Sequence, residues 1–190
     1  FKTEPDENLN GRSINYPRGK TLGGSSSING LLYIRGQARD YDIWRQQGNT
    51  GWGWDDVLPY FIKSEDQEQG KNKYHGINGP LSVSNIRIKL DILDQFRNAA
   101  EEMGIPKIND FNTGDNFGCD YFQVTEKNGL RCSTAVAYLN PAKKRSNLKV
   151  DVKAHVKQIN FEGNKAVGVS YWKNGTLINV IANKEVILSA

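Results

Sequence analysis

Residues 19–36 read Gly-Lys-Thr-Leu-Gly-Gly-Ser-Ser-Ser-Ile-Asn-Gly-Leu-Leu-Tyr-Ile-Arg-Gly, and this stretch governs how the rest of the chain is interpreted. Gly23 and Gly24 carry no Cβ atom, so the backbone can pass close to a planar or anionic ligand with its N–H groups turned outward. We expect the three serines that follow to open a helix near Ile28, whose N-terminus would suit a pyrophosphate or an electron-rich ring edge. Taken alone, however, the same residues also fit an ordinary capped loop.

The composition describes an ordered domain or two small lobes. The 190 residues include 37% apolar residues and 19 glycines, which indicates a real interior with many turns. A net charge of +4 comes from 25 basic and 21 acidic residues spread along the chain. This balance is too even for a nucleic-acid footprint, so we expect no nucleic-acid partner.

The two cysteines and the hydropathy indicate the cellular compartment of the protein. Cys119 and Cys132 lack metal-ligand spacing, and we expect them to be reduced thiols in a cytoplasmic protein. The sequence contains neither a signal-peptide pattern nor an apolar run long enough to cross a bilayer. The closing segment 185–190 is apolar like a strand buried in a parallel sheet, and from it we expect more chain at both ends.

The hydropathy pattern predicts a mixture of helices and strands. The segment 65–73 has no apolar residue and is expected to be a solvated loop, and a strand is expected from Gly79. Apolar residues at three-to-four spacing predict a helix over 90–103, with Gly104 as its stop signal.

The second half of the chain is expected to be richer in strands. Residues 121–125 predict a strand, the following Lys-Asn-Gly a turn, and Ser133 the cap of a short helix that ends before Pro141. From 147 onward the alternation is that of β-strands, with turns at 162–164 and at Asn174-Gly175. The predicted fold class is therefore α+β or mixed α/β.

The run 19–36 resembles the first sequence signature of the glucose-methanol-choline (GMC) oxidoreductases, and its continuation supports this. Further matching stretches follow in the family's order: Asp40-Tyr41-Asp42-Ile43-Trp44, Gly51-Trp52-Gly53-Trp54, Leu58-Pro59-Tyr60-Phe61, Tyr74-His75-Gly76, Arg131-Cys132-Ser133 and Val186-Ile187-Leu188-Ser189-Ala190. The resemblance covers nearly the whole chain and is strongest to the choline dehydrogenase-like branch.

The resemblance implies a flavin site. It places Thr21, Gly23, Gly24, Ser25, Asn29, Gly30, Leu31 and Leu32 against FAD, and the backbone of Val156 at the adenine end. Some family members attach the flavin through a histidine just before the motif asparagine. This chain has Ile28 at that position, so non-covalent FAD is expected.

The resemblance also implies an incomplete enzyme. Residues 1–80 would belong to the FAD-binding domain, with the signature loop and a lid around 74–81; 81–146 would belong to the substrate domain, and 147–190 would return to the FAD-binding domain. The N-terminal GxGxxG unit that receives the ADP pyrophosphate and the C-terminal catalytic histidine are both missing from the sequence. The implied reaction is hydride transfer from a primary alcohol to flavin N5, and no catalytic residue is assigned within this chain.

Several residues have simpler explanations, and one alternative function remains open. His75 is placed in a turn and His155 on the outer face of a strand, so we expect neither to be catalytic or to bind a metal. Core packing explains the tryptophans 44, 52 and 54, with Asp55 as a helix N-cap. The alternative is a non-catalytic β-rich module that binds a carbohydrate or a phosphorylated ligand. Membrane association through an electron acceptor has no support in the sequence.

Overall fold

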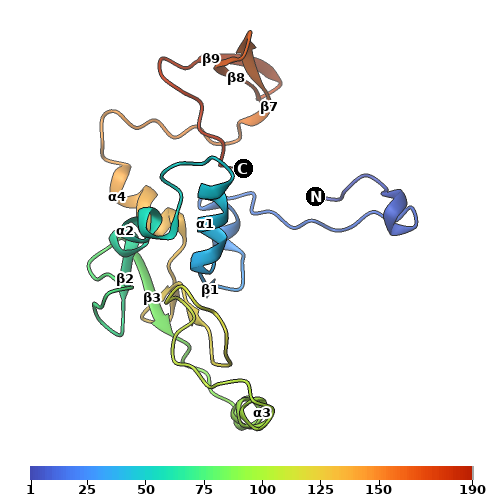
Figure 1. The fold of residues 1–190 in the computed structure, drawn as a ribbon. Helices are drawn as coiled ribbons and strands as arrows, with labels where there is room; N and C mark the ends of the chain where they lie inside the picture. The colour runs from blue at the N-terminus through green and yellow to red at the C-terminus, as the bar shows by residue number, and fades with distance from the viewer. Residues whose placement is uncertain (190) are drawn as a thin grey trace. The chain divides into compact units, whose positions relative to one another are not determined.

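The computed structural model describes residues 1–189 and confirms a mixed α/β fold (Figure 1). The chain forms two compact units, residues 1–142 and 143–190, and each is described here by itself. The predicted division at 146 falls close to the border between the units. The assignment of the three predicted parts to functional domains stays a prediction.

A four-stranded sheet organises the first unit. Its strand order is β1 (Leu32–Tyr33), β4 (Gln123–Val124), β3 (Leu81–Asn85) and β2 (Glu65–Gln67). The pairs β1–β4 and β3–β4 are antiparallel, whereas β2 and β3 are parallel. The sheet therefore brings together the end of the glycine-serine stretch and segments up to 92 residues away in sequence, as in the pair Leu32 and Val124.

The helices α1 (Ala38–Gln46) and α2 (Trp54–Ser64) pack through aromatic side chains around Tyr41. The Tyr41 ring lies 5.4 Å from the Trp44 ring and 5.7 Å from the Trp54 ring. The prediction of core packing was wrong for Trp44 and Trp52, which pack on aromatic neighbours but are 45% and 54% exposed within this chain. The prediction of Asp55 as an N-cap was wrong. The cap is Gly53, whose N–H donates to the Asp56 carboxylate at 3.0 Å, one residue further into the first turn.

The predicted solvated loop at 65–73 was wrong in its first part. Glu65 and Gln67 belong to β2 and are buried, with Glu65 fully excluded from solvent. A segment without apolar residues can enter the interior because each buried polar atom finds a partner there. Hydropathy alone does not register such pairing.

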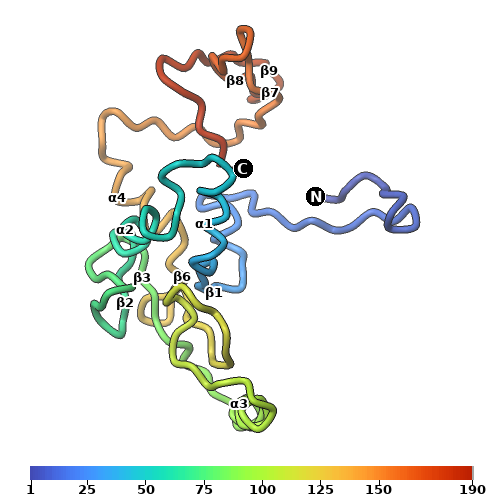
Figure 2. The backbone as a smooth tube through the Cα atoms, in the orientation of Figure 1, coloured from blue at the N-terminus to red at the C-terminus, as the bar shows by residue number. Residues whose placement is uncertain are grey.

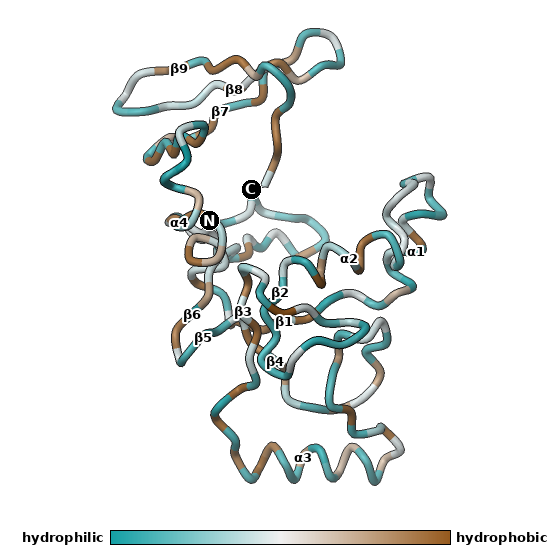
Figure 3. The backbone as a smooth tube through the Cα atoms, turned by 90° about the vertical axis from the view of Figure 1, so that its left-hand side faces the viewer, coloured by the Kyte–Doolittle hydropathy of each residue, from teal (hydrophilic) through white to brown (hydrophobic). Residues whose placement is uncertain are grey.

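Helix α3 (Asp91–Glu102) confirms the predicted helix, and Gly104 follows it at φ +86° as the stop signal requires. The apolar residues recur along the helix and are visible as brown segments in Figure 3. They are largely exposed within this chain, with Phe96 68% and Met103 82% accessible.

Short elements complete the first unit. They are the 3₁₀ turns η1 (Glu7–Leu9) and η2 (Gly24–Ser27), the strands β5 (Glu126–Lys127) and β6 (Leu130–Arg131), a π-helical turn η3 (Ala135–Leu139) and α4 (Asn140–Ala142). The predicted turn between β5 and β6 is confirmed by positive φ at Asn128 and Gly129. The strand expected over 121–125 is confined to β4. The helix expected to stop before Pro141 was wrong at its end, because η3 runs directly into α4, which includes Pro141.

The second unit is a three-stranded antiparallel meander of β7 (His155–Glu162), β8 (Lys165–Lys173) and β9 (Thr176–Ile181), whose course Figure 2 traces. Both predicted turns are confirmed, with Gly163, Asn174 and Gly175 at positive φ. The strand expected from 147 was wrong for 147–154, and residues 185–189 also form no strand. Alternating or continuous apolar residues need a neighbouring strand to become a ladder, and these segments have none among residues 1–189. Ala190, the last residue of the predicted strand, lies outside the described residues.

Candidate functional site

The glycine-serine stretch folds as a tight turn rather than as the start of a longer helix. Gly23 (φ +89°) and Gly24 (φ +54°) adopt left-handed backbone, and the serines themselves form η2. The helix expected to open near Ile28 was wrong, because Ile28 ends the turn. The serine side chains bond back to the preceding backbone, as Ser27 Oγ does to the Leu22 carbonyl at 2.8 Å, and this favours a turn over helix propagation.

The glycines of this loop fall into two kinds. A Cβ atom at Gly19 would collide with the Gly24 carbonyl, and one at Gly23 would lie 2.5 Å from Ser27 Oγ. These two glycines are required by packing inside the loop. By contrast, a Cβ atom at Gly24 or Gly30 would meet nothing within 4 Å, so these two leave an open backbone face.

Arg131 clamps the loop from the end of strand β6. Its Nη1 donates to Asn29 Oδ1 at 2.7 Å and to the Ser26 carbonyl at 3.1 Å, and its Nη2 donates to the Asn29 carbonyl at 2.8 Å. Asn29 Oδ1 also accepts the N–H of Leu31 at 3.1 Å, and Leu31 has the unusual φ of +68°. One guanidinium therefore fixes the part of the loop where the chain reverses into β1.

Thr134 makes a second tie between the same segments. Its N–H donates to Ser26 Oγ at 2.9 Å, and its hydroxyl donates to the Gly23 carbonyl at 3.2 Å.

Sequence reasoning found Arg131 only as part of a matching stretch and gave it no role. The signal that could have identified it is a conformational one: a loop with several left-handed residues needs side-chain partners, and these came from about 100 residues away.

The loop fits a flat, partly apolar ring. Its open backbone at Gly24 and Gly30 is accompanied by the apolar side chains of Leu22, Ile28 and Leu32, which are 41% to 54% exposed within this chain. A Cβ-free backbone lets a ring approach closely, and exposed aliphatic side chains gain free energy when a ring covers them. An open backbone face beside exposed aliphatic side chains is thus an arrangement that would suit an isoalloxazine ring.

The structure brings together most of the predicted cofactor-binding residues. Eight of them lie within this one loop and the start of β1: Thr21, Gly23, Gly24, Ser25, Asn29, Gly30, Leu31 and Leu32. Val156 lies in β7 of the other unit, and its side chain is exposed. Their contact with a cofactor stays a prediction.

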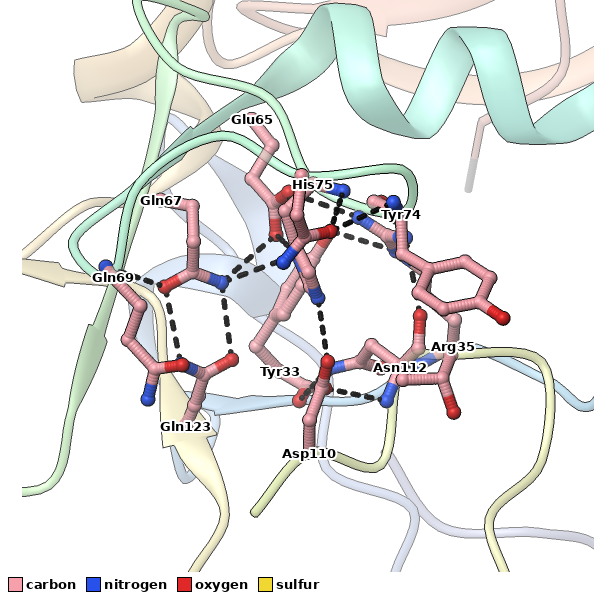
Figure 4. A network of polar contacts seen from close by, with 12 residues as sticks. Tyr33, Arg35, Glu65, Gln67, Gln69, Tyr74, His75, Asp110, Asn112 and Gln123 are labelled. Atoms are coloured by element: carbon pink, nitrogen blue, oxygen red, sulfur yellow. Dashed lines mark hydrogen bonds and ion pairs between the residues drawn. The ribbon is translucent and has the colours of Figure 1, made fainter.

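A buried cluster of charged residues lies next to the end of β1, and the sequence did not predict it (Figure 4). Glu65 Oε2 accepts from Arg35 Nη2 at 3.0 Å and from His75 Nδ1 at 2.8 Å, and His75 Nε2 lies 2.8 Å from Asp110 Oδ2. Arg35, Glu65 and His75 are each at most 4% exposed. With His75 protonated, the four residues carry two positive and two negative charges, so the cluster is neutral as a whole.

The carboxylates keep His75 charged. Burial by itself lowers the pKa of His75, but hydrogen bonds to Asp110 and Glu65 outweigh it and raise the pKa to about 9. Burial likewise opposes ionisation of Asp110, yet the bonds from His75 and the Asn112 N–H hold its pKa below the usual value. Burial raises the pKa of the neighbouring Tyr33 to about 12.

Neutral partners complete the cluster and connect it to the loop. The backbone N–H of Arg35 donates to Asn112 Oδ1 at 2.7 Å, and Arg35 Nη1 donates to the Tyr74 carbonyl at 2.7 Å. Arg35 follows β1 by two residues, so the cluster anchors the strand into which the glycine-serine loop runs. Both ring nitrogens of His75 are bonded within this cluster, and the absence of a catalytic role for it stays a prediction.

The segment 74–81, predicted to be a lid, is packed tightly in its first part. A Cβ atom at Gly76 would collide with the Ile62 carbonyl, and one at Gly79 would lie 2.5 Å from backbone atoms of Glu65. The Gly79 N–H donates to the Glu65 carbonyl at 2.9 Å. The lid stays a prediction, and in this structure Gly76 packs against α2 and Gly79 against β2.

The remaining features of the described residues concern metal binding, membrane spans and the two cysteines. Within residues 1–189, no group of His, Cys, Asp and Glu side chains is arranged to hold a metal ion. No helix in this part of the chain combines the length and hydropathy of a membrane span. Cys119 and Cys132 are both free thiols.

Comparisons with known proteins converge on one family. The family model described as "GMC oxidoreductase" matches residues 7–190. Human "Choline dehydrogenase, mitochondrial" is 42% identical over 189 residues, which is 100% of this chain and 32% of that protein. "Oxygen-dependent choline dehydrogenase" of Brucella anthropi is 43% identical over 190 residues, or 100% of this chain and 34% of that protein.

Solved structures show the same relationship. Pyridoxine 4-oxidase from "Mesorbium loti" has a TM-score of 0.87 at 28% identity, covering 97% of this chain and 37% of that one. An FAD-dependent oxidoreductase from Chaetomium thermophilum has a TM-score of 0.86 at 29% identity, covering 97% and 34%. The chain therefore spans about a third of the length of the curated relatives it matches.

Proposed function

Because the chain belongs to the GMC oxidoreductase family, we propose that it is the flavin-cradling part of an FAD-dependent enzyme that oxidises a primary alcohol. The observation that carries this proposal is the loop at 21–32. It combines an open glycine backbone, an exposed aliphatic rim and a clamp from Arg131. FAD would accept a hydride from the alcohol carbon.

The residues of this chain have supporting rather than acid–base roles in the proposal. The loop residues Gly24 and Gly30 bring the backbone against the ring, and Leu22, Ile28 and Leu32 cover its apolar surface. His75 cannot serve as the base, because both ring nitrogens are bonded to carboxylates in the interior. His155 lies on an exposed strand of the second unit. The proposal assigns the base to a residue beyond this sequence.

The attachment of FAD is proposed to be non-covalent. Ile28 stands where a covalently attaching histidine would be needed, and an aliphatic side chain cannot form such a bond. Precipitating the intact protein with acid should therefore release all yellow colour into the supernatant. Colour that stays with the pellet would contradict this part of the proposal.

The substrate is proposed to be a small alcohol of the choline type, on the strength of relatives named choline dehydrogenase. The test is the visible spectrum of the intact protein under anaerobic conditions. Flavin bands should be present and should bleach when choline is added, whereas a quaternary ammonium ion without the hydroxyl group, such as tetramethylammonium, should leave them unchanged. A colourless protein would overturn the proposal, and bleaching by other alcohols but not by choline would overturn the substrate.

A binding module for carbohydrate or phosphorylated ligands has less support. Family membership argues against it, and two of the three tryptophans that could have formed its platform pack on Tyr41.

As for location, the free thiols of Cys119 and Cys132 suit a reducing compartment, and we propose the cytoplasm. The name of the human relative, which includes "mitochondrial", supplies the alternative.

A further inference from the structure

Arg131 holds the loop with a charge that its own contacts do not neutralise. All three of its hydrogen bonds end on neutral oxygens: the Asn29 side chain, the Asn29 carbonyl and the Ser26 carbonyl. Within residues 1–189, no carboxylate forms an ion pair with it at 4.0 Å or less. By contrast, Arg35, Arg87 and Arg97 each meet a carboxylate.

The acid best placed to neutralise Arg131 is engaged elsewhere. Glu126 lies directly opposite Arg131 in the β5–β6 hairpin, a position from which opposite charges normally pair. Its Oε1 instead accepts the Gly129 N–H at 2.9 Å and lies 4.0 Å from Arg87 Nε. The guanidinium of Arg131 reaches away from the hairpin to the loop, so its positive charge is presented where the ligand is proposed to bind.

We propose, on the basis of the proposed function, that Arg131 is a positioning residue that also stabilises negative charge on the ring held by the loop at 21–32. Oxidation of the alcohol moves a hydride, which is two electrons and one proton, from carbon to the ring. The hydroxyl proton goes to the base, and the alcohol becomes an aldehyde. The ring therefore gains one negative charge, and a fixed cation nearby favours that reduced form over the oxidised one.

The same contacts fix both the charge and the shape of the loop. Asn29 Oδ1 accepts from Arg131 Nη1 and from the N–H of Leu31, so one oxygen links the cation to the residue whose left-handed backbone turns the loop. A fixed charge costs no reorganisation when negative charge develops, which is the condition for strong electrostatic stabilisation. A lysine would retain the charge but not the two-nitrogen clamp.

The experiment compares Arg131→Gln, Arg131→Lys and Arg87→Gln in the intact, FAD-loaded protein. Arg87→Gln is the control for the loss of one positive charge, because Arg87 is exposed and paired with Glu68. Two quantities are measured: bound flavin per protein, and the midpoint potential of the bound flavin by equilibration with a reference dye. We expect Arg131→Gln to lower the midpoint potential, Arg131→Lys to keep it while binding FAD more weakly, and Arg87→Gln to change neither.

Each outcome decides the question. A midpoint potential in Arg131→Gln equal to that of the wild type would overturn the electrostatic role. A midpoint potential that falls equally in the Gln and Lys variants would also overturn it, because the clamp alone would then explain Arg131. A midpoint potential that falls in the Gln variant and not in the Lys variant would support it. A wild-type protein without flavin bands would instead reject the proposed function, which separates the two failures.

Discussion

Replacing His75 with glutamine should remove a large pH dependence of stability. His75 has a pKa of about 9 in the folded protein, against 6.5 for an ordinary histidine. At about 1.4 kcal/mol per pKa unit, this difference corresponds to about 3 kcal/mol of folding free energy. Because the folded-state pKa is the higher one, this contribution is complete below pH 6.5 and is lost as the pH rises toward 9.

The measurement is urea unfolding, followed by tryptophan fluorescence, at pH 6 and pH 9.5. The wild type should lose about 2 to 3 kcal/mol more between these two values than His75→Gln does. The matched control is His155→Gln, which removes the only other histidine, on an exposed strand, and should leave the wild-type pH dependence intact. The substitution by glutamine also lowers the free energy of unfolding by an amount that does not depend on pH. This amount cancels when the two pH values are compared within each variant.

An identical loss of stability in His75→Gln and in the wild type would refute the reasoning. It would mean that the pKa of His75 in the folded protein equals the ordinary value of 6.5, and hence that Glu65 and Asp110 do not hold its proton above that pH. The charge balance of the buried cluster would then have to be described differently, because Arg35 alone would face two carboxylates.

Further predictions concern the same cluster and the loop. Glu65→Gln leaves Arg35 and His75 buried without their shared carboxylate and should lower the free energy of unfolding by about 3 to 5 kcal/mol in urea titrations; a change below about 1 kcal/mol would contradict the cluster's structural role. Gly23→Ala places a Cβ atom 2.5 Å from a serine hydroxyl at φ +89° and should destabilise the apoprotein by about 1 to 3 kcal/mol, measured by the same titration. Gly24→Val has open space around its Cβ atom, and its strain at φ +54° should cost about 1 to 2 kcal/mol, so the apoprotein should stay folded by circular dichroism, yet empty of flavin; full flavin content would argue against the cradle.

The sequence predicted those parts of the fold that depend on local rules. The helix before Gly104 and the hairpin at Asn174-Gly175 follow from residues that tolerate left-handed backbone at one position, and the structure confirms both. The strands expected at 147–154 and 185–189 do not form, because a strand depends on more than its local sequence. A ladder needs a partner strand, and local pattern carries no information about which partner is present.

The candidate site was predictable only in part for a similar physical reason. The glycine and serine residues of the loop indicate a turn by their residue type alone, so the sequence placed them correctly in one segment. Arg131 and Glu65 do not, because their importance arises from neighbours roughly 30 to 100 residues away in sequence. A run of polar residues such as 65–73 is read as solvated until its partners are known.

The central claim is that the loop at 21–32 lies against the flavin ring, and photolabelling tests it most directly. The intact apoprotein is loaded with FAD carrying an azide on the ring, irradiated, digested with trypsin and sequenced by mass spectrometry. Trypsin cleaves after Lys20 and Arg35, so the loop is recovered as one peptide, Thr21–Arg35. The account predicts the ring label on this peptide, with competition by unmodified FAD. A label found on other peptides while Thr21–Arg35 remains unmodified would contradict it.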